Sequence, residues 1–297
     1  MRPVDPGSDR QRHMPQDALD DVLDLLDIEP IEVNIFRGVQ PDEDRQRVFG
    51  GQVAGQALVA AARTVDDAVS VHSLHSYFLR PGDPSIPILY EVDRIRDGRS
   101  FVTRRVVAIQ HGRAIFNLQA SFHSDEPGFE HQMPMPEVPD PDELPSRAQL
   151  MEENPDAFPT MWRDRPRPVD MRYVTELPYR FKEAREPTQL VWFRADGTLP
   201  DDPVKHTCLL AYMSDMTLLD TAIIPHISPY RDDMMNASLD HLMWFHRPFR
   251  ADEWMLYATE SPSASGARGF NRGLIYSRDG TLIASVAQEG LMRKITR

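Results

Sequence analysis

Residues 73–81 read SLHSYFLRP, and residues 238–248, far along the chain, read SLDHLMWFHRP. Each segment opens a stretch rich in strand-forming residues, which passes through an element of glycine, arginine and phenylalanine, at residues 98–101 or 266–270, into a glycine-centred hairpin. Self-similarity at so long a spacing indicates two copies of one whole domain rather than a solenoid of short repeats. We therefore expect the functional site between the copies, or in the copy that kept its polar residues.

The composition of the chain limits the classes of protein to which it can belong. Its 297 residues are 41% hydrophobic, enough to bury one large core or two smaller ones, and the repeat favours two. No apolar run approaches the roughly 18 residues that span a bilayer, and the N-terminus has no apolar signal segment, so we expect a cytoplasmic protein without a membrane partner. The single cysteine, Cys208, fits a reducing compartment and disfavours a zinc site. The net charge of −13 disfavours binding to nucleic acid, so any phosphate group must be recognised by local arginines.

Proline, glycine and charge divide the chain into four segments. Residues 1–16 are polar without periodicity and are predicted to be a disordered tail. Residues 17–123 form an N-terminal unit and residues 172–297 a C-terminal unit, joined by a linker rich in proline and acidic residues at 124–171. The polar residues that we expect to carry out catalysis belong to the C-terminal unit.

Hydrophobic periodicity predicts a helix followed by a long antiparallel meander in both units. The fold class is therefore α+β, with two tandem units that each pack a long helix on a curved antiparallel β-sheet, the arrangement called a double hotdog. We expect helices over residues 17–26, 48–62 and 203–224, and strands over residues 31–37, 71–80, 86–95, 101–110, 114–122, 190–194, 237–246, 254–260, 268–277 and 282–292.

Asp215 is the first candidate catalytic residue. On the predicted helix it shares a face with apolar residues at spacings of three, four and seven. A carboxylate on such a face is costly to bury, and the cost is relieved by partners or by a raised pKa, which a general base working near neutral pH can use. The alternative is an exposed aspartate on a helix with a different register.

The other polar candidates give weaker signals. Gln288 alternates with Val286 and Gly290 on one face of its strand, so it is expected to point into the core or a cleft, where a structural glutamine bonded to the backbone is the alternative. Ser238 lies on a mixed face that indicates little, and His241 fits a structural role. A Ser-His-Asp hydrolase is disfavoured because the chain has no Gly-x-Ser-x-Gly elbow.

Two further features suggest a ligand site. Gly50, Gly51 and Gln52 lie at the start of a predicted helix, where glycines let a ligand approach free backbone N–H groups and the helix dipole favours negative charge on a carbonyl oxygen. Close packing of the helix on the sheet is the alternative. Arginines at matching places in the two copies can hold phosphate groups or can be solvated: Arg80, Arg99, Arg247 and Arg268.

Four strings carry a resemblance to a known family: VFGGQ at residues 48–52, YMSD at 212–215, SLDHLMWFHR at 238–247 and AQEG at 287–290. In this order and spacing they closely resemble the bacterial acyl-CoA thioesterase II family, which is built as a double hotdog. The resemblance covers residues 17–292.

The resemblance implies hydrolysis of fatty acyl-CoA to free acid and coenzyme A, without a metal or a bound cofactor, by a water held among Asp215, Ser238 and Gln288. It also implies further association into a homo-oligomer. Where related enzymes commonly have threonine, this chain has Ser238, which keeps the hydroxyl and loses the methyl group that restricts its rotamer. The residues expected to bind the acyl-CoA substrate are Gly50, Gly51, Gln52 and Arg268.

Three alternatives to this mechanism and function stay open. Asp215 could attack the thioester directly and form a mixed anhydride. A hydratase acting on unsaturated acyl-CoA shares the fold but pairs an aspartate with a nearby histidine, and His206 is badly placed for that. In a non-catalytic acyl-CoA binding or regulatory protein, Asp215 would be a structural residue.

Overall fold

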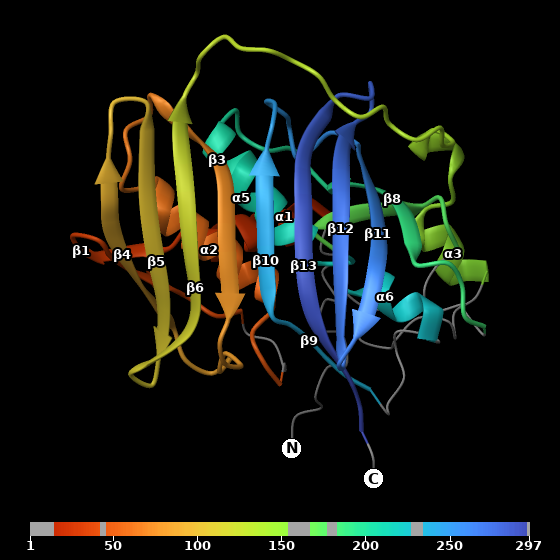
Figure 1. Ribbon diagram of the computed structural model, residues 1–297, viewed down its shortest axis with the longest axis horizontal. Helices are drawn as coiled ribbons and strands as arrows, with labels where there is room; N and C mark the ends of the chain where they lie inside the picture. Colours follow the sequence, from red (N-terminus) through yellow and green to blue (C-terminus); the bar gives the residue numbers. More distant parts are fainter. Residues whose placement is uncertain (1–14, 42–45, 154–166, 177–182, 227–233, 296–297) are drawn as a thin grey trace, which may run out of the picture.

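The strands of the computed structural model form one continuous antiparallel sheet, and the helices α1 (Pro15–Leu26), α2 (Gly50–Ala62) and α5 (Pro203–Ser214) lie along one face of it (Figure 1). No helix in the described ranges combines the length and apolar character needed to cross a membrane. The structure describes residues 15–41, 46–153, 167–176, 183–226 and 234–295.

The N-terminal half of the sheet is a meander preceded by the first two helices. α1 forms because its apolar residues recur at helical spacing, and it buries Leu19, Val22, Leu25 and Leu26. The strands of this half are β1 (Glu29–Glu32), β2 (Ile35–Gly38), β3 (Val69–Phe78), β4 (Ile88–Asp97), β5 (Phe101–Gln110) and β6 (Arg113–Ser124).

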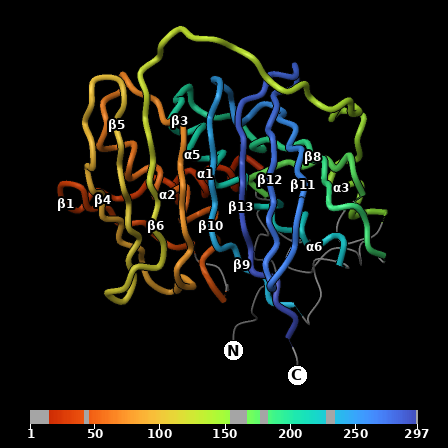
Figure 2. Tube along the Cα trace, in the orientation of Figure 1, coloured from red at the N-terminus to blue at the C-terminus, as the bar shows by residue number. Residues whose placement is uncertain are grey.

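The C-terminal half repeats this plan. Its strands are β7 (Val169–Tyr173), β8 (Thr188–Ala195), β9 (Met234–Ser238), β10 (Asp240–Phe245), β11 (Met255–Ser265), β12 (Arg268–Ser277) and β13 (Leu282–Lys294), and α5 is followed by α6 (Asp220–Ile223) and η4 (Ile224–His226). The connection between the halves carries η1 (Pro141–Glu143) and α3 (Arg147–Glu153), and Figure 2 shows it crossing from the end of β6 to the far side of the C-terminal half.

The order of the strands confirms the double hotdog. The sheet runs β1-β2-β4-β5-β6-β3-β10-β13-β12-β11-β8-β7, so that the second six strands mirror the first six about the β3–β10 junction. The two repeated sequence segments pair with each other at this junction, where Leu74 lies opposite Met243 and His75 opposite Leu242. The sequence repeat therefore lies at the pseudo-twofold axis of the chain.

The structure corrects three predicted elements. The helix expected over residues 203–224 ends at Ser214, and a turn separates it from α6. The strand expected over residues 237–246 is interrupted at Leu239, so that β9 pairs only with β13 while β10 pairs with both β3 and β13. The strand expected over residues 31–37 is the hairpin of β1 and β2, which turns at Asn34 with φ of 64°. In each case a short break interrupts a hydrophobic pattern that stays periodic on either side of it.

Two other predictions concern the segments outside the units. The predicted disordered tail, residues 1–16, lies outside the described residues except for Pro15 and Gln16, which begin α1. Part of the predicted linker, residues 154–166, is likewise outside them. The boundaries of the two units stay a prediction.

The two central helices, α2 and α5, pack directly against each other. A Cβ atom on Gly51 would lie 2.3 Å from the carbonyl oxygen of Tyr212, and one on Gly55 would lie 3.3 Å from that of Cys208. Small residues along α2 therefore allow the helix backbones to approach closely, and most of α2 is buried. This contact brings the first turn of α2 to the C-terminal end of α5.

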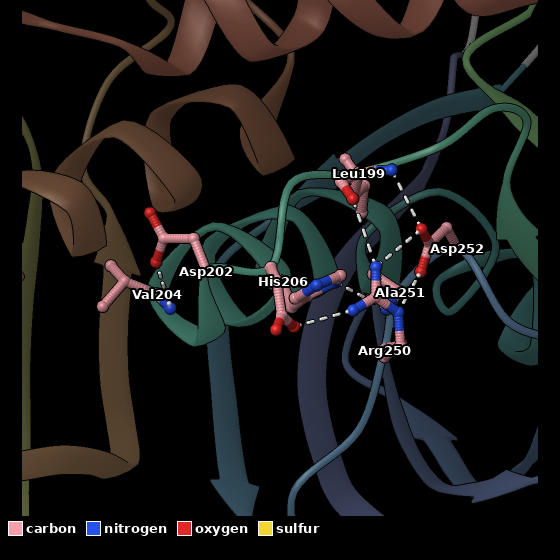
Figure 3. A network of polar contacts seen from close by, with 8 residues as sticks. Leu199, Asp202, Val204, His206, Arg250, Ala251 and Asp252 are labelled. Atoms are coloured by element: carbon pink, nitrogen blue, oxygen red, sulfur yellow. Dashed lines mark hydrogen bonds and ion pairs between the residues drawn. The ribbon is translucent and has the colours of Figure 1, made fainter.

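The N-terminal end of α5 is held by a polar network (Figure 3). The carboxylate of Asp202 accepts a hydrogen bond from the N–H of Val204 at 3.0 Å and so caps the helix. His206 Nδ1 accepts from the N–H of Ala251 at 3.0 Å, and Arg250 is ion-paired with Asp252. These contacts fix α5 and thus the position of Asp215, which directly follows its last residue.

Candidate active site

A cavity of about 550 Å³ lies between the two copies. The N-terminal copy contributes the residues before and at the start of α2, the end of β3 with the loop after it, and part of β6. The C-terminal copy contributes the turn after α5, the first residue of α6 and most of β9. The cavity therefore lies at one of the two places where we expect the functional site, between the copies. Its lining residues are Arg47, Val48, Phe49, Gly50, Val53, Phe78, Leu79, Arg80, Pro81, Gly82, Ile115, Phe116, Asp215, Met216, Leu219, Asp220, Met235, Asn236, Ala237, Ser238 and Leu239.

The carboxylate of Asp215 is half-buried in this cavity and accepts hydrogen bonds from both copies. Gln288 Nε2 donates to Asp215 Oδ1 at 2.6 Å, and the hydroxyl of Ser238 donates to the same oxygen at 3.3 Å. The backbone N–H of Gly51 also donates to the carboxylate. The other oxygen, Oδ2, lies beside Gly50, since a Cβ atom there would be 2.6 Å from it.

The structure thus brings together all three residues predicted to be catalytic. The predicted position of Asp215 on the face of a helix is wrong. Asp215 is the C-cap of α5, with φ of −81° and ψ of −6°, and lies where the helix breaks open beside the cavity. Burial raises the pKa of Asp215 to about 6, although the hydrogen bonds from Gln288, Ser238 and Gly51 act in the opposite direction. A carboxylate with this pKa is ionised at neutral pH yet still basic enough to take a proton.

Gln288 lies behind Asp215 rather than on the cavity wall. Its side chain is 0% exposed, and it is absent from the lining of the cavity. Besides the bond to Asp215, its Nε2 lies 3.2 Å from Nδ1 of His241, which is also 0% exposed. Because a carboxylate can only accept, the amide nitrogen must face Asp215, and its second N–H is directed at His241.

These contacts determine the protonation state of His241. Burial lowers the pKa of His241 to about 4, so that the ring is neutral at neutral pH. Since Nδ1 accepts from Gln288, the proton lies on Nε2, which donates to the hydroxyl of Ser214 at 2.9 Å. Ser214 in turn donates to the carbonyl of Ala211 at 3.1 Å. His241, for which the sequence pattern predicted a structural role, therefore orients the side-chain amide of Gln288 that binds Asp215.

Asp220 is a second carboxylate that the sequence pattern did not single out. It is the first residue of α6 and lines the same cavity as Asp215. Burial and the nearby charge of Asp215 raise the pKa of Asp220 to about 7. The only sequence signal was an acidic residue five positions after Asp215, which a continuous helix would have placed on another face.

The predicted substrate-binding residues lie in different surroundings. Gly50 lines the cavity, whereas Gly51 and Gln52 do not. Gln52 is 2% exposed, and its Nε2 donates to Gln40 Oε1 at 3.1 Å. Arg268 is exposed outside the cavity lining, where its Nε donates to Glu289 Oε1 at 2.9 Å. Their role in substrate binding stays a prediction.

Comparison with known proteins adds to this geometry. A model for the acyl-CoA thioesterase N-terminal domain matches residues 40–123, and a model for acyl-CoA thioesterase matches residues 167–291. Acyl-coenzyme A thioesterase 8 from Mus musculus is 45% identical over 286 residues, covering 92% of this chain and 88% of the mouse protein. The chain belongs to the acyl-CoA thioesterase family.

Bacterial members of the acyl-CoA thioesterase family are similar over the same span. Acyl-CoA thioesterase 2 from Haemophilus influenzae is 40% identical over 288 residues, covering 93% of this chain and 98% of that protein. The crystal structure of an acyl-CoA thioesterase II from Mycobacterium marinum is 48% identical and superimposes with a TM-score of 0.77, covering 93% of this chain and 99% of that one. The resemblance to the bacterial thioesterase II family is thereby confirmed.

Proposed function

We propose that this protein hydrolyses acyl-CoA thioesters and that Asp215 is the general base that activates the attacking water. The observation that supports this role is a half-buried carboxylate with a pKa of about 6, held by three donors at a cavity between the copies. Water bound at Asp215 Oδ2 loses a proton to the carboxylate as it attacks the thioester carbonyl, and the thiolate of coenzyme A leaves. Ser238, which also lines the cavity, is the hydroxyl that can contact this water.

Gln288 acts through Asp215. Because its side chain is fully buried and its Nε2 donates to Oδ1, it holds the carboxylate so that Oδ2 faces the cavity. Gln288 is thus a positioning residue in this proposal, where the sequence resemblance had it contact the water directly. Its own orientation depends on His241.

The developing negative charge on the thioester oxygen needs a donor in the same cavity. The first N–H groups of a helix have no acceptor within the helix. In α2 the N–H of Gly51 binds Asp215, while that of Gly50, which lines the cavity, makes no hydrogen bond within the described residues. We assign Gly50 N–H the role of polarising the carbonyl, aided by the dipole of α2.

The geometry does not favour the competing functions. The hydratase hypothesis needs a histidine beside Asp215, but His206 is near the N-terminal end of α5 and bound to Ala251, whereas Asp215 follows the C-terminal end. A purely structural Asp215 would not account for a carboxylate that lines the cavity and carries a raised pKa. A cytoplasmic location and a homo-oligomeric state are further parts of the proposal, suggested by the family.

The rate should depend on pH through Asp215. Since the base must be ionised, kcat/KM for an acyl-CoA should be low in acid, rise through a pKa of about 6 and level off above it. Initial rates of coenzyme A thiol release across this range measure the profile. The same rise of kcat/KM on the acidic side of the profile, its acidic limb, should remain in Asp220→Asn, because Asp220 is not the base in this mechanism. A profile that is flat through pH 6, or a limb that disappears with Asp220, would contradict the assignment of Asp215.

Two substitutions of His241 separate its two hydrogen bonds. Asparagine places its oxygen near the position of Nδ1 and can accept from Gln288, whereas glutamine reaches the position of Nε2 and leaves Gln288 without this acceptor. We therefore expect His241→Gln to lose about tenfold more in kcat than His241→Asn, the effect of one buried hydrogen bond.

The pH profile of the two variants distinguishes positioning from packing. When Gln288 is no longer held, its bond to Asp215 weakens, so the acidic limb of kcat/KM should move to higher pH in His241→Gln and stay in place in His241→Asn. Equal losses of kcat with unchanged limbs would show that His241 serves only to fill the core.

A further inference from the structure

Two arginines lie where the cavity meets solvent, on segments that are bound to each other. Arg47 precedes Val48, whose N–H donates to the carbonyl oxygen of Gly82 at 3.1 Å, two residues after Arg80. The side chain of Val48 also packs on Gly82, since a Cβ atom there would lie 2.9 Å from Val48 Cγ2. Arg47 and Arg80 are both exposed and both line the cavity that contains Asp215.

Each of these arginines is oriented by a backbone carbonyl. Arg47 Nη2 donates to the carbonyl oxygen of Asn236 at 2.7 Å, and Arg80 Nη1 donates to that of Ala114 at 2.6 Å. A neutral acceptor fixes the direction of a guanidinium without neutralising its charge. Within the described residues neither arginine is paired with a carboxylate, and its one carbonyl acceptor leaves most of the five N–H donors of the guanidinium for a ligand.

The remainder of the cavity indicates which ligand group these donors would meet. The lining is otherwise apolar apart from a few polar residues and the two aspartates, and Arg47 and Arg80 are its only cations within the described residues. Because the whole chain carries a net charge of −13, an anionic substrate gains no long-range attraction and must be recognised by local charges. The planar fork of arginine matches phosphate oxygens in geometry and charge.

We infer that Arg47 and Arg80 together bind the phosphate groups of the coenzyme A moiety, with the pantetheine arm running along the cavity to Asp215. This inference rests on the proposed function, since it takes acyl-CoA as the substrate. Of the arginines that the sequence suggested for phosphate groups, it keeps Arg80, adds Arg47, and leaves out Arg268, which is paired with Glu289 outside the cavity lining.

Three thioesters that share one acyl chain test this inference. Acyl-CoA carries the diphosphate and the ribose phosphate, acyl-dephospho-CoA carries the diphosphate alone, and acyl-pantetheine carries neither. The variants are Arg47→Gln and Arg80→Gln. The matched control is Arg94→Gln, because Arg94 is also exposed and held by a neutral acceptor, Asn34 Oδ1 at 2.8 Å, but lies on β4 outside the cavity lining.

We expect each of the two variants to raise KM for acyl-CoA about tenfold, the loss of one charge-assisted contact, with kcat nearly unchanged. KM for acyl-pantetheine should stay the same, because that substrate has no phosphate to lose. An effect that persists with acyl-dephospho-CoA assigns the pair to the diphosphate, and one that disappears assigns it to the ribose phosphate. Arg94→Gln should behave as the wild type with all three substrates.

Other results would overturn the inference. A rise in KM that is equal for acyl-CoA and acyl-pantetheine would show that the arginines act without the phosphates, and no rise in either variant would show that they do not bind substrate. A phosphate-dependent rise in Arg268→Gln alone would return the role to Arg268. If the wild type hydrolyses acyl-pantetheine while the arginine variants show no phosphate-dependent change, the inference fails but the proposed function stands.

Discussion

We expect Asp215→Asn to lose at least about a hundredfold in kcat for acyl-CoA hydrolysis, the range that follows from removing a general base. Asparagine has the size of aspartate, and its side-chain oxygen can still accept from Gln288 and Ser238, so the geometry of the site is kept. What the substitution removes is the basic oxygen facing the cavity. Thiol release with a series of short to long acyl-CoAs measures the loss.

The stability of this variant provides the control for folding. The pKa of Asp215 in the folded protein, about 6, lies above its ordinary value of 3.8, so the favourable contribution of this group is complete below about pH 4 and is lost as pH rises through about 6. At pH 8, Asp215→Asn should thus be as stable as the wild type or more stable, by up to about 3 kcal/mol. Urea unfolding at pH 8 measures this difference.

A chemically matched substitution completes the experiment. Asp93→Asn makes the same change on an exposed residue of β4 outside the cavity lining and should leave both activity and stability unchanged. If folded Asp215→Asn kept its activity within a few fold, the base would have to lie elsewhere, and Asp220 would be the next carboxylate to test.

The second large effect is expected on stability, from Gly51→Ala. The added methyl carbon would lie 2.3 Å from the backbone oxygen of Tyr212, which cannot move without shifting α5. Overpacking of this kind costs about 1 to 3 kcal/mol or more, and exceeds the gain of up to about 1 kcal/mol that alanine brings to a helix. The free energy of unfolding from urea titration should therefore fall. Activity should fall as well, because α2 carries the N–H groups that meet Asp215 and the cavity.

Gly128→Ala is the matched control for this prediction. A Cβ atom on Gly128 has no heavy atom within 4 Å, so this variant should be as stable as the wild type. If Gly51→Ala unfolded at the same urea concentration as Gly128→Ala, the close contact between α2 and α5 would not exist in solution.

Much of the fold follows from local pattern. The strand over residues 268–277 is predicted from alternating residues and turn signals, and β12 has the same bounds. Gln288 is predicted to face inward from the alternation of its strand, and it is fully buried. The two similar segments predict a pair of domains, and β3 and β10 pair with each other at the centre of one sheet. Period and repetition are properties of the sequence itself, so no tertiary information is needed to read them.

The break after α5 could not be predicted in the same way. The residues from 215 to 219 keep helix-like backbone angles at both ends, with φ and ψ of −81° and −6° at Asp215 and −65° and −30° at Leu219. The apolar residues also continue at helical spacing through this turn, so the sequence pattern does not mark the point where the helical hydrogen bonds stop. Asp215 lies at a helix end beside a cavity and not on the helix face that the pattern predicts.

The remaining parts of the site depend on long-range contacts. Gln288 reaches Asp215 because β13 lies next to β9 and β10, and Gly51 reaches it because α2 packs on α5. His241 gains its role only through Gln288, and Arg47 only through the contact of its segment with Gly82. The sequence pattern near each of these residues does not indicate which distant residue it contacts in the folded chain.

The central claim is that water attacks the thioester directly while Asp215 takes its proton. A single turnover in water labelled with heavy oxygen, with enzyme in excess over acyl-CoA, tests it. The label should appear in the fatty acid in the first turnover, and mass spectrometry of the peptide that contains Asp215 should find none. An unlabelled fatty acid together with labelled Asp215 would contradict the claim, because it would mean that the carboxylate itself attacks and that water then opens a mixed anhydride.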